Sequence, residues 1–157
     1  MCLHFCHTPV RIIQTTQKIY LKNSSPTAII NWFEKNPPLG GLGKIKLAEA
    51  LLEQGRNAEV EKLIKEGWTT AEIRKNDLGY YRAKFKKFLT SEDHLKRADY
   101  LSWERKYWDL KRMLKYLPKD ERALYNARQI LMSNSYGVDN AIAKVPAHLK
   151  NLSLIHI

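Results

Sequence analysis

The sequence contains only two cysteines, Cys2 and Cys6, and both lie near its start. Neither can crosslink the rest of the chain, so a fold built on several disulfides is excluded. Together with His4 and His7 they offer metal-capable atoms. Their spacing matches no usual zinc site, however, and no second ligand pair follows. We therefore expect no metal site and no bound cofactor.

Long apolar runs are also missing. No stretch approaches the roughly 18 apolar residues that suggest a membrane span. The first residues lack the basic start, apolar core and small-residue cleavage site of a secretory signal. With 44% hydrophobic and 27% charged residues in a chain of 157, the balance is that of one folded domain and not of a disordered chain.

Motifs for catalysis are equally scarce. Residues 40–43 (GGLG) lack the Lys-Ser or Lys-Thr pair that completes a phosphate loop. Nearly all acidic residues lie at predicted helix starts or on polar faces, where capping or solvation explains them. No pair of carboxylates therefore indicates glycoside hydrolysis. We interpret His94 and His148 as surface residues and not as bases. The residues themselves therefore indicate no catalytic, cofactor-binding or metal-binding position.

Positive charge is abundant and unevenly placed. The net charge is +11, and residues 74–122 carry 15 basic and 8 acidic side chains. Aromatic and basic residues interleave there, which suits a polysaccharide or another anionic ligand, or nucleic acid; the alternative is a buried aromatic core with a solvated basic face. The aromatic residues are Tyr80, Tyr81, Tyr100, Trp103, Tyr107, Trp108, Tyr116 and Tyr125. The basic residues are Arg82, Lys84, Lys86, Lys87, Arg105, Lys106, Lys111, Arg112 and Lys115.

Residues 46–65 organise the chain. Apolar residues three and four positions apart predict two short antiparallel helices, and neither helix can bury its apolar stripe alone. Gly55 lies where a helix end needs positive φ. The two stripes are Leu47, Ala48, Leu51 and Leu52, and then Val60, Leu63 and Ile64.

The same pattern returns fifty residues later. Residues 96–101 align with 46–51, although Arg105 stands where Gly55 stood, and a looser copy spans 127–145. Such self-similarity predicts an all-α fold, an α-solenoid or superhelical stack of helical hairpins, with an irregular helical bundle as the alternative.

The helices outside these copies are predicted from their start and stop residues. We expect helices beginning at Pro26, over residues 70–89, and after Thr90 and Pro118. The glycine-rich residues 40–43 predict a flexible link. Trp103 and Leu114 are expected to face inward, and no strand is predicted.

Five segments carry a family resemblance. They are 32–39 (WFEKNPPL), 46–52 (KLAEALL), 90–101 (TSEDHLKRADYL), 117–124 (LPKDERAL) and 137–146 (GVDNAIAKVP). In this order and spacing they resemble the N-terminal superhelical domain of soluble lytic murein transglycosylases, in the alphaproteobacterial form. The likeness covers about residues 24–151, which we expect to form the helical-hairpin domain.

The resemblance implies a periplasmic enzyme that cleaves the MurNAc–GlcNAc bond of peptidoglycan and leaves a 1,6-anhydro product. In that family a separate lysozyme-like domain supplies a catalytic glutamate followed by serine. This sequence contains no Glu-Ser pair. We therefore expect a non-catalytic scaffold fragment that is inactive alone. Its implied partners are peptidoglycan glycan strands and the missing catalytic domain.

Both ends depart from the family pattern. Residues 1–23 match nothing and are expected to be poorly ordered, while residues 152–157 (LSLIHI) form a tail that looks non-native, as if the reading frame were truncated. A truncated start would also explain the missing export signal. Two other functions stay open: a free-standing helical-repeat protein that binds a protein or peptide, and a nucleic-acid binder driven by charge.

Overall fold

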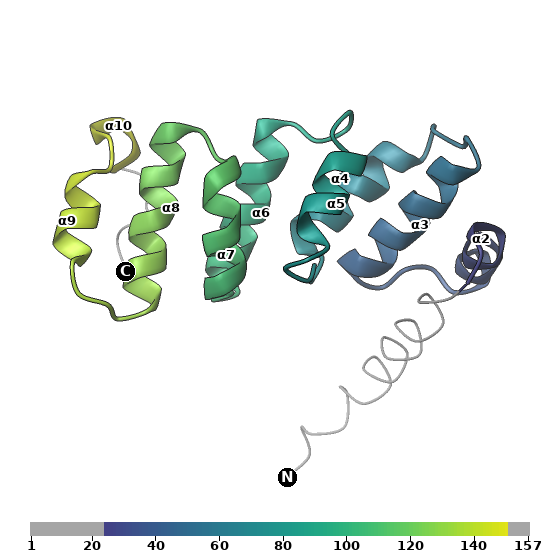
Figure 1. Ribbon diagram of the computed structural model, residues 1–157, viewed down its shortest axis with the longest axis horizontal. Helices are drawn as coiled ribbons and strands as arrows, with labels where there is room; N and C mark the ends of the chain where they lie inside the picture. The colour runs from purple at the N-terminus through teal and green to yellow at the C-terminus, as the bar shows by residue number, and fades with distance from the viewer. Residues whose placement is uncertain (1–23, 151–157) are drawn as a thin grey trace, which may run out of the picture. The chain divides into compact units, whose positions relative to one another are not determined.

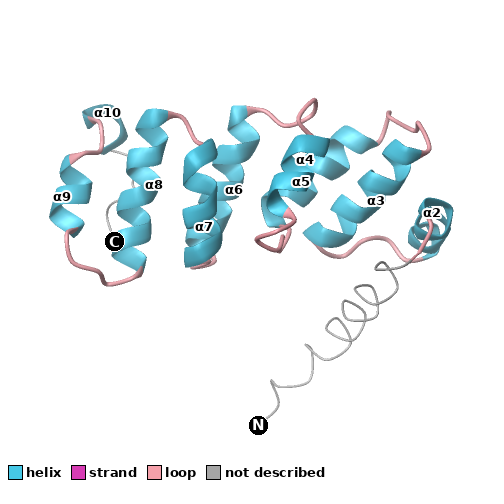
Figure 2. Ribbon diagram, viewed as in Figure 1, coloured by secondary structure: helices cyan, strands magenta, loops and turns pink. Residues whose placement is uncertain are grey.

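The computed structural model describes residues 24–150, and every regular element in that range is a helix (Figure 2). The all-α prediction is confirmed. By its contacts the chain divides into two compact units, one ending at Glu72 and the other beginning at Ile73. The predictions for residues 1–23 and 152–157 fall outside the described residues. Within the described part, no helix is both long and apolar enough to cross a membrane.

The helices are labelled in Figure 1. The first unit holds α2 (Pro26–Lys35), α3 (Gly41–Glu53) and α4 (Val60–Thr70). The second unit holds α5 (Leu78–Lys84), α6 (Ser91–Trp103), α7 (Tyr107–Met113), the 3-10 turn η1 (Leu114–Tyr116), α8 (Lys119–Met132), α9 (Val138–Ala143) and α10 (Ala147–Lys150).

Helix α2 begins and ends where local rules predict. The Ser25 side chain accepts a hydrogen bond from the backbone N–H of Ala28 at 3.3 Å, and Pro26 takes the first helical position. The helix stops at Lys35, two residues before Pro37. Its buried side includes Phe33.

Helix α3 begins earlier than predicted. Gly41 and Gly43 belong to the helix and are buried, so the expectation of a flexible link over residues 40–43 is wrong. A Cβ atom on Gly41 would collide with the backbone of Ala71, and one on Gly67 would lie 3.0 Å from Ile45 Cγ1. The glycines therefore let α3 and α4 pack closely, a long-range benefit that outweighs their poor helix propensity.

Helix α3 ends in a Schellman motif. The Arg56 N–H donates to the Leu51 carbonyl at 3.0 Å, and the Gly55 N–H donates to the Leu52 carbonyl at 3.1 Å. Gly55 has φ 72°, as predicted. These bonds satisfy carbonyls at the helix end and turn the chain into α4.

Helix α6 ends in the same motif without a glycine. The Lys106 N–H donates to the Leu101 carbonyl at 2.8 Å, and the Arg105 N–H donates to the Ser102 carbonyl at 3.2 Å. Arg105 adopts φ 53°. The helix–turn–helix prediction for residues 96–115 is therefore confirmed locally, with the glycine replaced by a residue that tolerates left-handed backbone poorly.

Helix α8 ends in a third such turn. Asn134 has φ 49°, and its N–H donates to the Leu131 carbonyl at 3.2 Å. The Ser135 N–H donates to the Ile130 carbonyl at 3.4 Å. Three described helices, α3, α6 and α8, thus share one pattern of termination.

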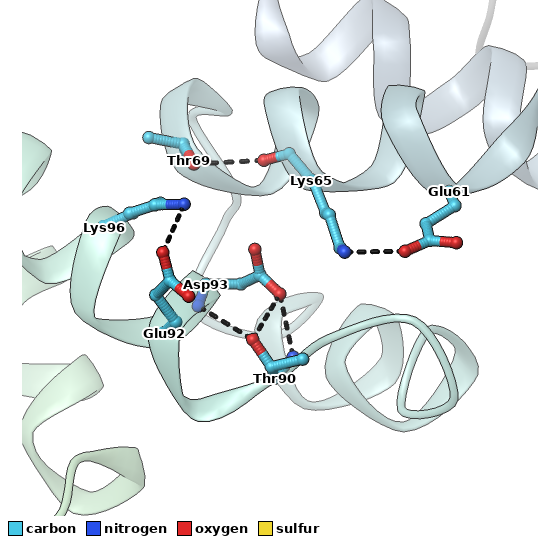
Figure 3. A network of polar contacts seen from close by, with 7 residues as sticks. All are labelled: Glu61, Lys65, Thr69, Thr90, Glu92, Asp93 and Lys96. Atoms are coloured by element: carbon cyan, nitrogen blue, oxygen red, sulfur yellow. Dashed lines mark hydrogen bonds and ion pairs between the residues drawn. The ribbon is translucent and has the colours of Figure 1, made fainter.

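The long helix predicted over residues 70–89 is wrong. Helix α4 already ends at Thr70, residues 71–77 are not helical, and α5 covers only seven residues. The start of α6 is confirmed. The Thr90 hydroxyl accepts from the Asp93 N–H at 3.3 Å, and the Asp93 carboxylate accepts from the Thr90 N–H at 2.8 Å (Figure 3).

In the second unit α7 contacts both α6 and α8 (Figure 1). Two expectations of burial are wrong here: Leu114 is only half-buried, and Trp103 is 64% exposed. The buried apolar side chains of this unit are Ile73, Leu78, Tyr81, Phe85, Ala98, Leu101, Leu110, Met113, Leu117, Leu124, Tyr125, Ala127, Ala141 and Val145.

Candidate ligand-binding surface

The aromatic residues of the basic region separate into core and surface. Tyr81 and Tyr125 are buried, whereas Tyr80, Trp103 and Trp108 are more than half exposed. An exposed tryptophan ring contributes little hydrophobic free energy to folding. The exposed rings are therefore the ones available to a ligand.

Much of the charged surface is explained by ion pairs. Lys44 pairs with Glu66 at 2.6 Å across α3 and α4 and lowers the pKa of that carboxyl. Lys96 pairs with Glu92 at 2.7 Å along α6 (Figure 3). Exposed pairs of this kind contribute about 0–1 kcal/mol each. Neither Lys44 nor Lys96 belongs to the predicted aromatic and basic set.

Tyr116 lies at the centre of a basic cluster. Arg82 Cζ is 4.5 Å and Lys115 Nζ 4.9 Å from the centroid of its ring. The His94 ring lies 6.2 Å away and is half-buried, so its interpretation as a surface residue is wrong. Burial, and next the Arg82 charge, lower the pKa of His94. His148 is exposed, as expected.

Arg97 is buried inside the second unit, with 1% of its surface exposed. Burial lowers the pKa of Arg97 to about 10, while the negative charge of Asp109 acts in the opposite direction. Asp109 also pairs with Arg112. Sequence reasoning missed Arg97, since nothing in the pattern distinguishes a buried arginine from an exposed one.

A second buried arginine, Arg128, joins α8 to α6. Its Nη1 donates to Asp99 Oδ1 at 2.9 Å, and its Cζ lies 4.8 Å from the centroid of the Tyr125 ring. The Tyr125 hydroxyl donates to the same Asp99 oxygen at 3.3 Å. Burial, followed by the Asp99 charge, raises the pKa of Tyr125 to about 12. Tyr125 therefore stays a neutral donor at physiological pH.

A pocket of about 540 Å³, here called the α6–α8 pocket, lies at the C-terminal ends of these two helices. Arg128 lines it, and both Nε and Nη2 of this side chain are buried without a hydrogen-bond partner among residues 24–150. The lining residues are Ser102, Trp103, Arg105, Arg128, Leu131, Met132 and Asn134. Of these, Trp103 and Arg105 belong to the predicted aromatic and basic set, and Arg128 does not.

The chemistry of the pocket suits binding. It is lined by the exposed ring of Trp103, by the largely buried Arg128 and by the polar residue Asn134. Within residues 24–150 no group of three or more His, Cys, Asp or Glu side chains is placed to hold a metal ion. The residues Cys2, His4, Cys6 and His7 lie outside that range.

Comparison with known proteins gave no match. No family model matches the chain, and neither a curated protein nor a solved structure is significantly similar to it.

Proposed function

We propose that this chain is a non-catalytic scaffold, the superhelical part of a soluble lytic murein transglycosylase, and that it contacts peptidoglycan glycan strands. The observation that carries the proposal is the repeated helix end. Leu51, Leu101 and Ile130 each accept the outer bond of the same turn, at the ends of α3, α6 and α8. Recurrence of one helix–turn unit is what a stack of helical hairpins requires.

The second support is chemical. Glycan strands are rich in hydroxyl and acetamido oxygens and present flat ring faces. Trp103 and Trp108 have exposed indole rings, and the polar residues Ser102, Arg105 and Asn134 line the same pocket as Trp103. A surface with these groups suits a saccharide better than it suits an apolar ligand. Within this proposal the chain acts in the periplasm and depends on a separate domain for bond cleavage.

Binding to purified murein sacculi tests the proposal. We expect the chain to stay bound at roughly 150 mM salt, where the Debye length is about 8 Å and surface attraction is strongly screened. The matched control is an unrelated helical protein of the same net charge, +11. Elution of both proteins at the same salt concentration would reduce the interaction to nonspecific electrostatics and contradict the proposal.

The same experiment addresses the alternative of a free-standing helical-repeat protein. Such a protein binds a peptide or protein partner and has no reason to prefer sacculi over a protein-free control matrix. Loss of binding when the glycan is removed by muramidase, with no loss on protease treatment of the sacculi, supports the glycan. The opposite pattern supports a protein or peptide partner.

A further inference from the structure

Two positively charged side chains meet over one aromatic ring in the second unit. Arg82 on α5 places its Cζ atom 4.5 Å from the centroid of the Tyr116 ring, and Lys115 places its Nζ atom 4.9 Å from the same point. Arg82 and Tyr116 belong to different elements, α5 and η1, so the fold brings them together. We call Arg82, Lys115 and Tyr116 the Tyr116 cluster.

No carboxylate offsets the two positive charges of the cluster. Within residues 24–150 neither Arg82 nor Lys115 forms an ion pair. The carboxylate of Asp93 acts electrostatically on His94, next to the cluster, but it is committed to the start of α6. It accepts hydrogen bonds from the N–H and the hydroxyl of Thr90, each at 2.8 Å (Figure 3).

The excess of positive charge affects His94. Its ring lies 6.2 Å from the ring of Tyr116. Burial, and next the charge of Arg82, lower the pKa of His94; Arg97 adds to this effect, while Asp93 opposes it. Positive charge therefore prevails around the Tyr116 ring, and an anion would be attracted there.

The guanidinium of Arg82 is held in place but keeps donors for a ligand. Its Nε is buried without a partner in the described part of the chain, and its Cζ lies over the Tyr116 ring. The two terminal nitrogens are not among the buried unpaired atoms of residues 24–150 and form no hydrogen bond there, so they keep access to solvent. Lys115 is exposed. The cluster thus combines a positioned fork of N–H donors with a flexible ammonium, two groups that proteins use to bind phosphate.

Charge decides which anion fits best. A phosphomonoester carries about −1.5 to −2 charge at pH 7 and has three acceptor oxygens, which suits two cations without a counter-charge. A phosphodiester carries a single negative charge, as a carboxylate does, and would leave one cation unbalanced.

We infer that the Tyr116 cluster binds a phosphomonoester group, with the terminal nitrogens of Arg82 donating to its oxygens and Lys115 supplying the second positive charge. This site goes beyond the proposed scaffold and does not depend on it.

The competing explanation is that the two cations only stabilise the fold by lying over an aromatic ring. The same unit offers a matched comparison. Lys111 Nζ lies 5.4 Å from the centroid of the Trp108 ring, and no other cation is found over that ring among the described residues. Lys111 and Lys115 are both exposed. If the contact with a ring were all that mattered, the two lysines would be equivalent.

Titration of the full chain with methyl phosphate at about pH 8 and constant ionic strength, followed by NMR or calorimetry, separates the two explanations. At this pH the ligand is a dianion, because its second pKa is about 6. We expect saturable binding that Arg82→Gln weakens by about tenfold or more, the loss expected for a charge-assisted fork. Lys111→Gln is the control and should leave the affinity unchanged.

A second variant guards against loss of folding, since Arg82 is half-buried. Lys115 is exposed, so Lys115→Gln should leave the melting temperature nearly unchanged. We expect it to weaken methyl phosphate binding by at least about threefold. The contrast between Lys115→Gln and Lys111→Gln decides the question even if Arg82→Gln does not fold.

Two further ligands define the class and its source. Dimethyl phosphate carries one charge and should bind at least about fivefold more weakly than methyl phosphate. Vesicles with phosphatidic acid present the monoester on a membrane surface. Binding of methyl phosphate alone assigns the site to a soluble ligand, and binding of both ligands assigns it to the phosphomonoester whatever carries it.

Three results would overturn the inference. The first is no saturable binding of methyl phosphate below about 10 mM. The second is equal weakening by Lys115→Gln and Lys111→Gln, which would assign the effect to charge in general. The third is binding of dimethyl phosphate, or of a single-stranded oligonucleotide, more tightly than methyl phosphate, which would indicate a surface for phosphodiester strands.

Discussion

The hairpin of α3 and α4 and the hairpin of α6 and α7 begin with helices that correspond residue for residue at a spacing of fifty. Helix α3 spans Gly41–Glu53 and α6 spans Ser91–Trp103. Both end in the same two backbone bonds, once with Gly55 and once with Arg105 in the left-handed region. Both helices end in this turn because a leucine near the end is buried and the last carbonyls need hydrogen-bond donors. Glycine is not required for the turn; it only lowers the conformational free energy of the residue with positive φ.

The hairpins differ in how their helices meet. In the first, Gly41 and Gly67 allow close approach of α3 and α4. In the second, the corresponding positions are Ser91 and Leu117, and side chains as large as that of Arg97 fill the interior. The same type of turn therefore connects two helix pairs that pack in different ways. Substitutions at paired positions test which features the hairpins share and which they do not.

The largest effect is expected at the shared leucines. Leu51 and Leu101 are 2% and 3% exposed, so Leu51→Ala and Leu101→Ala should each lower the free energy of unfolding by about 2–5 kcal/mol. Leu114→Ala is the control and should cost less, because Leu114 is only half-buried. Urea denaturation measures all three. A cost at Leu114 equal to that at Leu101 would contradict the described core.

Glycine packing should distinguish the hairpins. Gly41→Ala places a Cβ atom against the backbone of Ala71, which cannot move aside easily, so we expect a loss of about 1–3 kcal/mol. Ser91→Ala, the corresponding change on α6, should be nearly neutral because Ser91 is exposed. Thermal melts of the two variants check this. Similar melting temperatures for both would show that close approach of α3 and α4 is not needed.

Substitutions at the left-handed residue of each turn should change the free energy of unfolding in opposite directions. Gly55→Ala should cost about 1 kcal/mol from backbone strain alone, because nothing lies within 4 Å of the added Cβ atom. Arg105→Gly should relieve backbone strain and raise the free energy of unfolding by up to about 1 kcal/mol. Part of this gain is offset because glycine increases the conformational entropy of the unfolded chain. Arg105→Ala is the control that removes the charge and keeps the positive φ. Stabilisation by Arg105→Ala as large as that by Arg105→Gly would assign the effect to charge.

The smallest effect concerns His94, which only the second hairpin carries. Burial and the Arg82 charge lower its pKa from 6.5, so the unfolded chain takes up this proton at higher pH than the folded chain does. The free energy of unfolding should therefore fall as the pH drops below about 6.5. Melting temperatures at about pH 7.5 and pH 5.5 measure the loss, which His94→Gln should reduce. An equal loss in the variant would assign the pH dependence to other groups.

Local sequence rules predicted much of the fold. The Ser25 cap with Pro26, the Thr90–Asp93 capping box and the positive φ at Gly55 all depend on residues within a few positions of one another. The start of α3 was missed because Gly41 is favourable in the helix only through its close approach to Ala71, thirty residues away. The break over residues 71–77 was missed for a different reason: apolar residues continue at helical spacing across it, although the backbone is not helical there.

The candidate site was predicted only in part. The interleaved aromatic and basic region contributes Trp103 and Arg105 to the lining of the α6–α8 pocket. The pattern placed Trp103 in the core, because spacing along a helix gives its faces but not which neighbour covers them. Arg128 gave no signal, since its unpaired edge depends on Asp99 and Tyr125 lying beside it in space.

The scaffold proposal is tested most directly by incubating the purified chain with murein sacculi and measuring retained protein and released soluble fragments together. We expect retention that withstands roughly 150 mM salt, with no release of soluble fragments. Failure to be retained beyond a protein of equal charge, or release of soluble glycan fragments, would contradict it.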